Sequence, residues 1–407
     1  VEKQILTSQQ SCNKSRILFF IYKTFFVLML NSKSFIIFLI IVVSIAACNN
    51  DQQKKQQKKS NLSFNKLSKQ ERNNYHRLAD IFYAKNLQFT LSGGILVAKN
   101  GEIVFEKYNG YSNWLTQEKM DANTPIHIAS VSKTFTAVAI LKMVQENKLS
   151  LQDSVQKFFP NFPYKGVTVK LLLSHRSGLP NYLYFMDTAW KTNTLIQNKD
   201  VLNYLIDKQP AAYASPNRVF HYCNTNYVLL ALIVEKIEGI GFPDYVKNNI
   251  FIPLGMKNSY VFNIADSAKY TPSFNYNNQP ILMDKFDVVY GDKNVYSTVK
   301  DMFLWDKALY DTSFIGKQIL QQTFTPYSNE KAGHKNYGLG FRLYIDGADT
   351  TVYHNGWWHG NNSVFIRLTQ DTATIITLGN KYNRSIYTSR QLTNIFSKKN
   401  TVSELEE

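Results

Sequence analysis

Short runs of β-branched and aromatic residues lie at both ends of the central part of the chain and predict strands. Near the start, Gly94 to Ala98 and Glu102 to Tyr108 are two such runs, joined by Lys99-Asn100-Gly101. Asn-Gly between apolar runs is a strong indication of a hairpin turn. Further runs near the end predict the remaining strands: Tyr337 to Ile345, Thr350 to His354, Asn362 to Leu368, and Thr372 to Leu378.

Between these two blocks the spacing of apolar residues is mainly helical. The clearest predicted helices are Thr136 to Glu146, Val201 to Lys208, Tyr227 to Glu238, and Lys300 to Leu309. Strands at both ends with helices between them imply one sheet assembled from distant pieces. The expected fold class is therefore α/β of the α+β kind: an antiparallel sheet built from N- and C-terminal strands, flanked by helices, with an inserted all-helical subdomain.

The first 48 residues carry the pattern of an export segment. Thirteen uncharged residues, Phe35 to Ala47, follow Lys33 and end at Cys48. This run is too short to span a bilayer but suits the apolar region of a signal peptide. Ile-Ala-Ala-Cys at its end resembles the lipobox of bacterial lipoproteins, which predicts a lipid on Cys48. The alternative is a membrane anchor that includes Ile17 to Leu30, and residues 1–28 are interpreted as an over-extended gene start.

Composition divides the rest of the chain. Residues 49–74 are rich in Gln, Lys, Asn and Ser, which predicts a flexible tether before a globular domain at 75–398 and a polar tail at 399–407. The formal net charge is +16, but the basic residues are scattered without interleaved aromatics, so we expect no nucleic-acid partner. The expected location is the bacterial cell envelope, with the membrane contacted through the N-terminal lipid. Removal of Cys12 and lipidation of Cys48 would leave Cys223 without a disulfide partner.

Ser-x-x-Lys is the first pattern that could carry chemistry. On a helix its two residues share a face, so the lysine amine can reach the serine hydroxyl and act as its base. Ser130 with Lys133 stands out because an almost wholly apolar helix follows, which would bury the lysine. Ser132 is the rival hydroxyl, but it points about 100° away around the helix. The pattern starts at six serines: Ser11, Ser63, Ser130, Ser154, Ser297 and Ser328.

Two further groups are candidates for the same site. In Tyr222-Cys223-Asn224 the tyrosine can relay a proton and the asparagine can contact a substrate carbonyl. Tyr-x-Asn also occurs at Tyr111, Tyr276 and Tyr327, where a turn is the simpler explanation.

The other group is His354-Asn355-Gly356, followed by Trp357 and Trp358 at the end of a predicted strand. A glycine there would let a substrate lie along the strand. A lone histidine at a strand end is more often structural. Trp357 and Trp358 would line a pocket beside it, which suits a partly apolar substrate, although two aromatic residues in a strand are more often packing. His354 and His359 could also be considered as zinc ligands, but no supporting Cys, Asp or Glu spacing exists, so neither a metal nor a cofactor is expected.

These groups, in this order, resemble the serine β-lactamase and penicillin-binding-protein family, class C type. The similarity covers about residues 78–397. Flanking stretches agree: residues 128–134 (IASVSKT), 171–180 (LLLSHRSGLP), 253–256 (PLGM), 297–301 (STVKD) and 337–340 (YGLG). The resemblance implies the β-lactamase/transpeptidase fold.

The resemblance also implies roles for single residues. Ser130 would be the acylated nucleophile, Lys133 its base, Tyr222 the proton shuttle to the leaving group, and Asn224 a substrate contact. The backbone N–H groups of Ser130 and Trp357, next to Gly356, would form the oxyanion hole. His354 would face the distal part of the substrate, and His175 would be a structural cap without a catalytic role.

One departure from the family pattern concerns specificity. β-Lactamases of this family usually carry a lysine where His354 stands, and its ammonium meets the antibiotic's carboxylate. A histidine is mostly neutral near pH 7. The expected activity is therefore hydrolysis of a small ester, amide or peptide, closer to an esterase or D-amino-acid/DD-peptidase than to a true β-lactamase. The alternative is a receptor that is acylated slowly or not at all.

Overall fold

The apolar runs at the two ends of the sequence form one seven-stranded antiparallel sheet. In the computed structural model, which describes residues 62–396, its order is β10-β11-β12-β13-β14-β1-β2. The first and last blocks of sequence therefore meet where β14 pairs with β1, as predicted. The strands are β1 (Gly93–Lys99), β2 (Glu102–Asn109), β10 (Lys335–Tyr337), β11 (Arg342–Asp346), β12 (Asp349–Trp358), β13 (Asn361–Leu368) and β14 (Ala373–Gly379).

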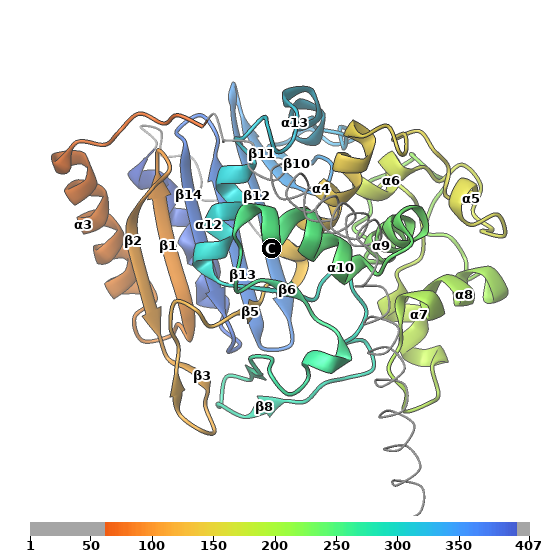
Figure 1. Cartoon of the computed structure of the whole chain (residues 1–407), viewed down its shortest axis with the longest axis horizontal. Helices are drawn as coiled ribbons and strands as arrows, with labels where there is room; N and C mark the ends of the chain where they lie inside the picture. Colours follow the sequence, from red (N-terminus) through yellow and green to blue (C-terminus); the bar gives the residue numbers. More distant parts are fainter. Residues whose placement is uncertain (1–61, 397–407) are drawn as a thin grey trace, which may run out of the picture. The chain divides into compact units, whose positions relative to one another are not determined.

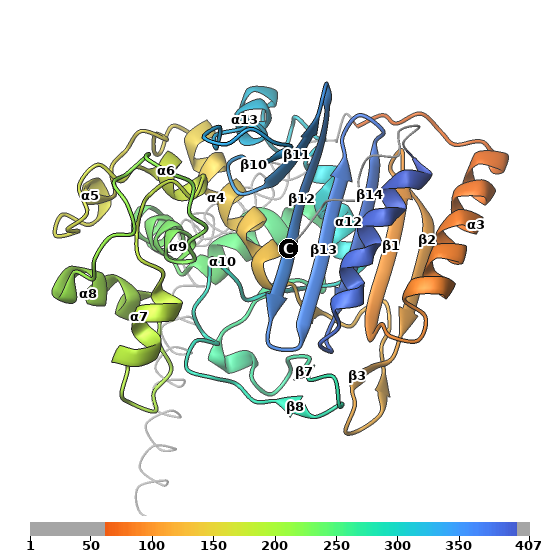
Figure 2. The same ribbon diagram turned by 180° about the vertical axis from the view of Figure 1, so that it is seen from behind.

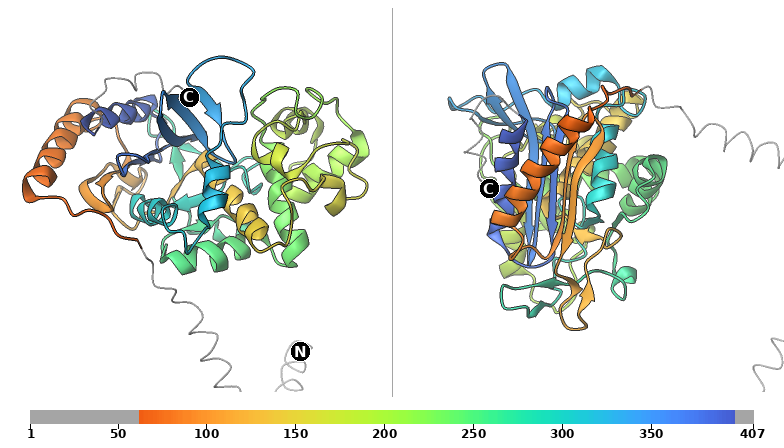
Figure 3. Two further views of the ribbon diagram at one scale, coloured as in Figure 1. Left: turned by 90° about the horizontal axis from the view of Figure 1, so that it is seen from above. Right: turned by 90° about the vertical axis from the view of Figure 1, so that its left-hand side faces the viewer.

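Both faces of this sheet are buried, which explains the continuous apolar runs. Successive side chains of a strand point to opposite faces. Leu96 and Ala98 of β1 join one hydrophobic core, and Ile95 and Val97 join another on the other face. Figure 1 shows α12 (Val299–Ala308) in front of the sheet, whereas α3 (Lys69–Asn86) and η4 (Arg384–Ile395) cover the face seen in Figure 2. The right-hand view of Figure 3 shows the sheet edge-on between these layers.

Two local features near the N-terminal strands follow from the residues that form them: a hairpin turn and a helix cap. Asn100 and Gly101 have φ angles of 50° and 70°, the left-handed conformation that a two-residue hairpin needs, so the predicted turn is confirmed. Helix α3, which the sequence analysis did not predict, begins at Lys69. Ser68 caps it through a reciprocal pair of hydrogen bonds with Glu71, so regular structure begins inside the segment predicted to be a tether up to residue 74.

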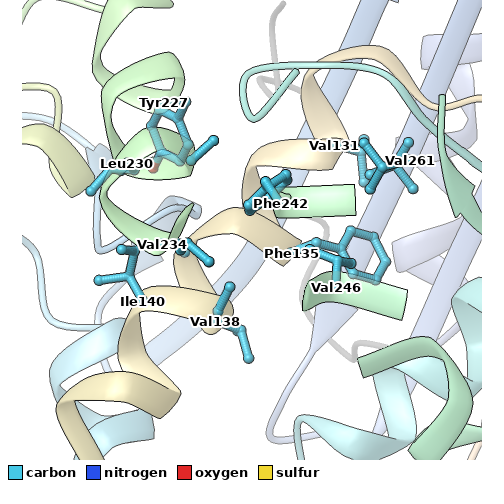
Figure 4. Close-up of a cluster of buried hydrophobic side chains, with 14 of the residues drawn as sticks. Val131, Phe135, Val138, Ile140, Tyr227, Leu230, Val234, Phe242, Val246 and Val261 are labelled. Atoms are coloured by element: carbon cyan, nitrogen blue, oxygen red, sulfur yellow. The ribbon is translucent and has the colours of Figure 1, made fainter. Parts of the chain in front are cut away.

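The middle of the chain is helical, as predicted, and surrounds two buried helices. In α4 (Ser132–Gln145) and α9 (Thr225–Glu238), apolar residues lie on all sides. Figure 4 shows Val138 and Ile140 of α4 near Val234 of α9, whereas Phe135 lies beside Val246 of α10 (Phe242–Val246). The other helices are α5 (Val155–Phe158), α6 (Val169–Leu173), α7 (Tyr182–Ala189), α8 (Asn198–Lys208), η2 (Lys247–Phe251), α11 (Ile252–Leu254), η3 (Ile264–Asp266) and α13 (Lys317–Thr323).

Small sheets complete the fold. They consist of β3 (Tyr111–Asn113) with β4 (Glu118–Lys119), β5 (Ile126–His127) with β9 (Val295–Ser297) and β6 (Tyr260–Val261), and β7 (Ser273–Phe274) with β8 (Pro280–Ile281). No helix within residues 62–396 is both long enough and apolar enough to cross a membrane. The predictions for Cys48, the signal segment and the polar tail from 399 lie outside the described residues.

Candidate active site

Ser130 lies in a strained turn between β5 and α4. The turn is η1 (Ala129–Val131), and Ala129 has φ 48°, an uncommon conformation for a residue with a side chain. Such strain persists only where surrounding contacts hold it, and it is frequent at active sites. Here the Ala129 N–H donates to His127 Nδ1 at 3.1 Å, and Ser363 Oγ of β13 donates to the Ile128 carbonyl at 2.7 Å.

Lys133 reaches Ser130, as its spacing predicted. Its Nζ lies 3.0 Å from Ser130 Oγ and donates to the Asp292 carbonyl at 2.7 Å. The lysine side chain is fully buried, whereas Ser130 remains partly exposed at the pocket wall. Ser132 points elsewhere, since its Oγ accepts the Val295 N–H at 3.0 Å. The helical-face argument that separated the two serines is therefore confirmed.

Tyr222 lies between the side chains of Lys133 and Arg342. Lys133 Nζ is 5.0 Å from the centroid of its ring, and the guanidinium carbon of Arg342 is 5.1 Å from it. The Tyr222 hydroxyl is buried and has no hydrogen-bond partner among residues 62–396. A phenol in this position can exchange a proton with a substrate atom and with the lysine. Asn224 precedes α9 and lines the same pocket.

His175 contacts Cys223 and Tyr222, in agreement with a structural role. It is fully buried, its Nδ1 accepts the Cys223 N–H at 3.1 Å, and its ring lies 4.2 Å from that of Tyr222. Burial, followed by the charge of Lys133, lowers the pKa of His175 well below its usual value. A neutral imidazole can accept this backbone hydrogen bond at all physiological pH values.

Gly356 allows β12 to approach the Ser130 turn. A Cβ atom at this position would lie 2.4 Å from Ser363 Oγ and 2.5 Å from the Ile128 carbonyl oxygen. Both are closer than any normal contact, so only glycine fits without displacement of the turn. Contrary to the expectation that the strand ends near residue 354, β12 continues to Trp358, and the three-residue motif lies inside it.

His354 does not line the pocket, which differs from the expectation that it faces the distal part of the substrate. It is fully buried, its Nε2 lies 3.2 Å from the Tyr337 hydroxyl, and its Nδ1 lies 2.7 Å from the Asn355 carbonyl oxygen. Burial, then the charges of Arg342 and Lys133, lower the pKa of His354 well below its usual value. The imidazole is therefore neutral, as expected, but it is part of the core.

The pocket in front of Ser130 has a volume of about 400 Å³ and mixed walls. Trp357 is 63% exposed, so the aromatic character predicted for this wall is present. The described lining residues with charged side chains are three cations and one carboxylate: Lys293, Arg342, Arg384 and Asp292. The lining is completed by Ser130, Leu183, Tyr222, Asn224, Asn355, Gly356, Trp357, Trp358, Asn362, Tyr382 and Tyr387.

Comparison with known proteins agrees with this geometry. The Beta-lactamase family model matches residues 84–388, three quarters of the chain. The chain belongs to the Beta-lactamase family. Penicillin-binding protein 4* of Bacillus subtilis (strain 168) is 31% identical over 334 residues, which cover 78% of this chain and 74% of the relative. The narrower assignment to the class C type stays a prediction.

Solved structures show the same fold. The octameric penicillin-binding protein homologue from Pyrococcus abyssi has a TM-score of 0.67 and 26% identity, and the match covers 79% of this chain and 77% of the homologue. The D-amino acid amidase from Ochrobactrum anthropi SV3 in complex with L-phenylalanine has a TM-score of 0.64 and 20% identity, covering 80% and 98%. The family and the β-lactamase/transpeptidase-like fold expected from the sequence are therefore confirmed.

The sequence analysis did not identify four charged residues of the pocket. They belong to three segments of the chain that lie outside the three motifs. Asp292 and Lys293 precede β9, which pairs with β5 and so brings them beside the Ser130 turn. Arg342 begins β11, next to β12 in the sheet. The nearest indication in the sequence was the family-like stretch at 337–340, two residues before Arg342. Arg384 lies at the start of η4 and had no indication.

One cluster in the described part of the chain offers three possible metal ligands, but ion pairing accounts for it. Asp284, Asp287 and His359 have ligand atoms within 4.8 Å of one another. His359 Nε2 lies 3.0 Å from both carboxylate oxygens of Asp287, which also accepts the Trp358 Nε1–H at 2.6 Å. Burial lowers the pKa of His359, but the hydrogen bond and charge of Asp287 outweigh it and raise that pKa overall.

This ion pair predicts a pH-dependent stability. Because the pKa of His359 is above its unfolded value of about 6.5, the stabilisation is complete below that pH and is lost as pH rises through the folded pKa. We expect His359→Gln to cost roughly 1–2 kcal/mol at pH 6 and less at pH 8.5. Urea unfolding of wild type and variant at both pH values measures this difference. The exposed His334→Gln is the control, and a pH-independent difference would contradict the assignment.

Proposed function

We propose that this protein is a serine hydrolase that cleaves an ester or amide through an acyl-enzyme on Ser130. The observation that carries the proposal is the 3.0 Å contact between Lys133 Nζ and Ser130 Oγ at the wall of an open pocket. A buried amine in hydrogen-bond reach of a hydroxyl is the arrangement that an activated serine needs. Membership of the Beta-lactamase family supports the same chemistry.

In the proposed reaction, Ser130 Oγ attacks the substrate carbonyl carbon while its proton passes to Lys133 Nζ. The bond from the carbonyl carbon to the leaving group then breaks, and Tyr222 passes the proton to the departing atom. Water repeats the sequence on the ester of Ser130 and releases the acid. The backbone N–H groups of Ser130 and Trp357 are the proposed donors to the negative oxygen of both intermediates.

The charges of the pocket change the expected substrate preference. Esters were ranked above β-lactams because no cation was expected where a substrate carboxylate would bind. Arg342 lines the pocket beside Tyr222 and supplies such a charge, although His354 does not. We therefore propose that the substrates are esters or amides, and we no longer expect esters to be preferred over β-lactams. The pocket suits a leaving group that carries a carboxylate.

A hydrolysis panel tests the proposed activity. Nitrophenyl esters, D-aminoacyl amides and nitrocefin are assayed with the full chain, alongside labelling by a fluorescent phosphonate. Turnover of at least one class together with labelling supports the proposal. Labelling without turnover of any substrate would favour the slowly acylated receptor, and absence of both would show that the site is not an activated serine.

We also propose that the protein is held at the cell envelope by a lipid on Cys48. The support is the apolar run that ends in Ile-Ala-Ala-Cys. We expect Cys48→Ala to leave the membrane fraction or to stall before processing. Membrane fractionation and intact mass measure this, with Cys12→Ala as the control. A Cys48→Ala protein that stays in the membrane with the wild-type mass shift would contradict lipidation.

A further inference from the structure

The segment that leads to Tyr222, residues 213–223, forms neither a helix nor a strand. We call it the Tyr222 loop. Its place beside Ser130 depends on contacts with other parts of the chain. The Tyr222 hydroxyl has no hydrogen-bond partner within residues 62–396, so its position follows from the loop backbone and from the packing of its ring. The contacts that hold this loop therefore bear on the proposed transfer of a proton to the leaving group.

The backbone of the Tyr222 loop lies along residues 175–178, which follow α6. Three of its N–H groups donate to carbonyls of that segment: Tyr213 to Gly178 at 2.9 Å, Asn217 to Arg176 at 2.8 Å, and His221 to His175 at 2.9 Å. The loop is thus held at its start, its middle and its end. All of these bonds join it to one neighbouring segment of the helical part of the chain.

Arg176 adds side-chain contacts to the middle of the loop. Its Nε donates to Asn217 Oδ1 at 2.9 Å, and its Nη2 donates to the Asn217 carbonyl at 2.7 Å. Its Nη1 pairs with Glu330 Oε1. All three nitrogen atoms of the guanidinium are therefore engaged, and the residue is only 9% exposed. Because a guanidinium is planar and its donors point in fixed directions, these contacts form a rigid link.

Glu330 connects the Tyr222 loop to the sheet. It lies between α13 and β10, the edge strand of the seven-stranded sheet. The same Oε1 that meets Arg176 accepts the Phe220 N–H at 3.1 Å, two residues before Tyr222. The side chains of Arg176 and Glu330 are 11% and 31% exposed, so water screens this pair less than a surface ion pair. Neither residue lines the pocket in front of Ser130, and any effect on the reaction passes through the loop.

We propose that Arg176 and Glu330 are positioning residues for Tyr222, because their ion pair fixes the loop just before this tyrosine. The inference rests on the proposed function, in which Tyr222 gives its proton to the departing atom and regains one from Lys133 Nζ. Loss of the pair misplaces this proton donor and leaves the contact between Lys133 and Ser130 in place. Proton donation matters most for a poor leaving group, since a good one departs as an anion. The expected consequence is a change in leaving-group preference.

The p-nitrophenyl and phenyl esters of one acyl group, the group that the full chain hydrolyses fastest, test this proposal. They give the same acyl-enzyme and differ only in the acidity of the leaving group. The quantity measured is kcat/KM for the phenyl ester divided by kcat/KM for the p-nitrophenyl ester. Tyr222→Phe is the reference and should lower this ratio by about a hundredfold. We expect Glu330→Ala to lower it by about tenfold and Glu330→Gln, which keeps an acceptor for the Phe220 N–H, by about threefold.

Further variants separate positioning from stability. A smaller folded fraction lowers kcat/KM for both esters by the same factor and cancels in the ratio. Since the two side chains act as one link, Arg176→Gln combined with Glu330→Gln should lower the ratio no further than Arg176→Gln alone. Glu118→Gln, an exposed residue of β4, is the matched control and should leave the ratio unchanged. If Arg176→Gln does not fold, the two Glu330 variants decide.

The outcomes also separate this inference from the proposed function. A ratio that falls in Tyr222→Phe but stays at the wild-type value in the Glu330 variants would overturn the positioning role while the proposed hydrolase stood. A Tyr222→Phe ratio equal to that of wild type, or a wild type that hydrolyses neither ester, would instead overturn the proposed function at Tyr222 or at Ser130, and this inference with it.

Discussion

Ser130→Ala is expected to lower the hydrolysis rate by roughly 10⁴-fold or more, because Ser130 Oγ is the hydroxyl that Lys133 Nζ contacts within residues 62–396. Ser132 is adjacent in sequence, but its Oγ holds the Val295 N–H at 3.0 Å and is fully buried. Ser132→Ala should therefore keep most of the activity and lose about 1–3 kcal/mol of unfolding free energy, the cost of a buried N–H without an acceptor.

The comparison requires two measurements on each variant. Steady-state hydrolysis gives the catalytic loss, and urea unfolding gives the change in stability. Ser130→Ala is expected to be folded and inactive, and Ser132→Ala to be active and less stable. Equal catalytic losses in both variants at equal stability would contradict the division of roles between the two hydroxyls.

His354→Lys should destabilise the protein by roughly 3–5 kcal/mol and should not create a carboxylate site. The side chain at this position is fully buried and contacts the Tyr337 hydroxyl, and Arg342 and Lys133 lie close enough to lower the pKa of the native histidine further. A lysine ammonium would be placed in the same low-dielectric, positively charged surroundings without a carboxylate partner.

Chemical unfolding of wild type, His354→Lys and His354→Gln measures this effect. The glutamine variant is the neutral control, because its amide can both donate and accept, as the imidazole does. We expect it to lose less stability than the lysine variant. A stable His354→Lys protein with faster turnover of acidic substrates would show that residue 354 does face the pocket, as the family pattern implied.

The parts of the site that could be predicted from sequence are the local ones. Ser130 and Lys133 are three residues apart, so the single turn of η1 and the start of α4 bring them together. The two central helices were recognisable because apolar residues surround them, and the strands because both of their faces are buried. The turn at Asn100 and Gly101 could be predicted because these residue types favour the positive φ angles that a two-residue hairpin needs.

The parts that could not be predicted depend on tertiary pairing and on strand length. Nothing local shows that residue 292 lies beside Lys133, since the pairing of β5 with β9 creates that contact. His354 was wrongly predicted to face the substrate because the strand was expected to end near residue 354. When β12 is extended to Trp358, two-residue alternation places His354 and Gly356 on the buried face and leaves Trp357 exposed.

The position of the covalent adduct shows directly whether Ser130 is the nucleophile. Full-length protein is treated with a fluorophosphonate, digested, and analysed by peptide mass spectrometry. We expect one modified site, Ser130, with labelling that disappears in Ser130→Ala and persists in Ser132→Ala. An adduct on any other residue, or none on active protein, would contradict the assignment of Ser130 as the nucleophile.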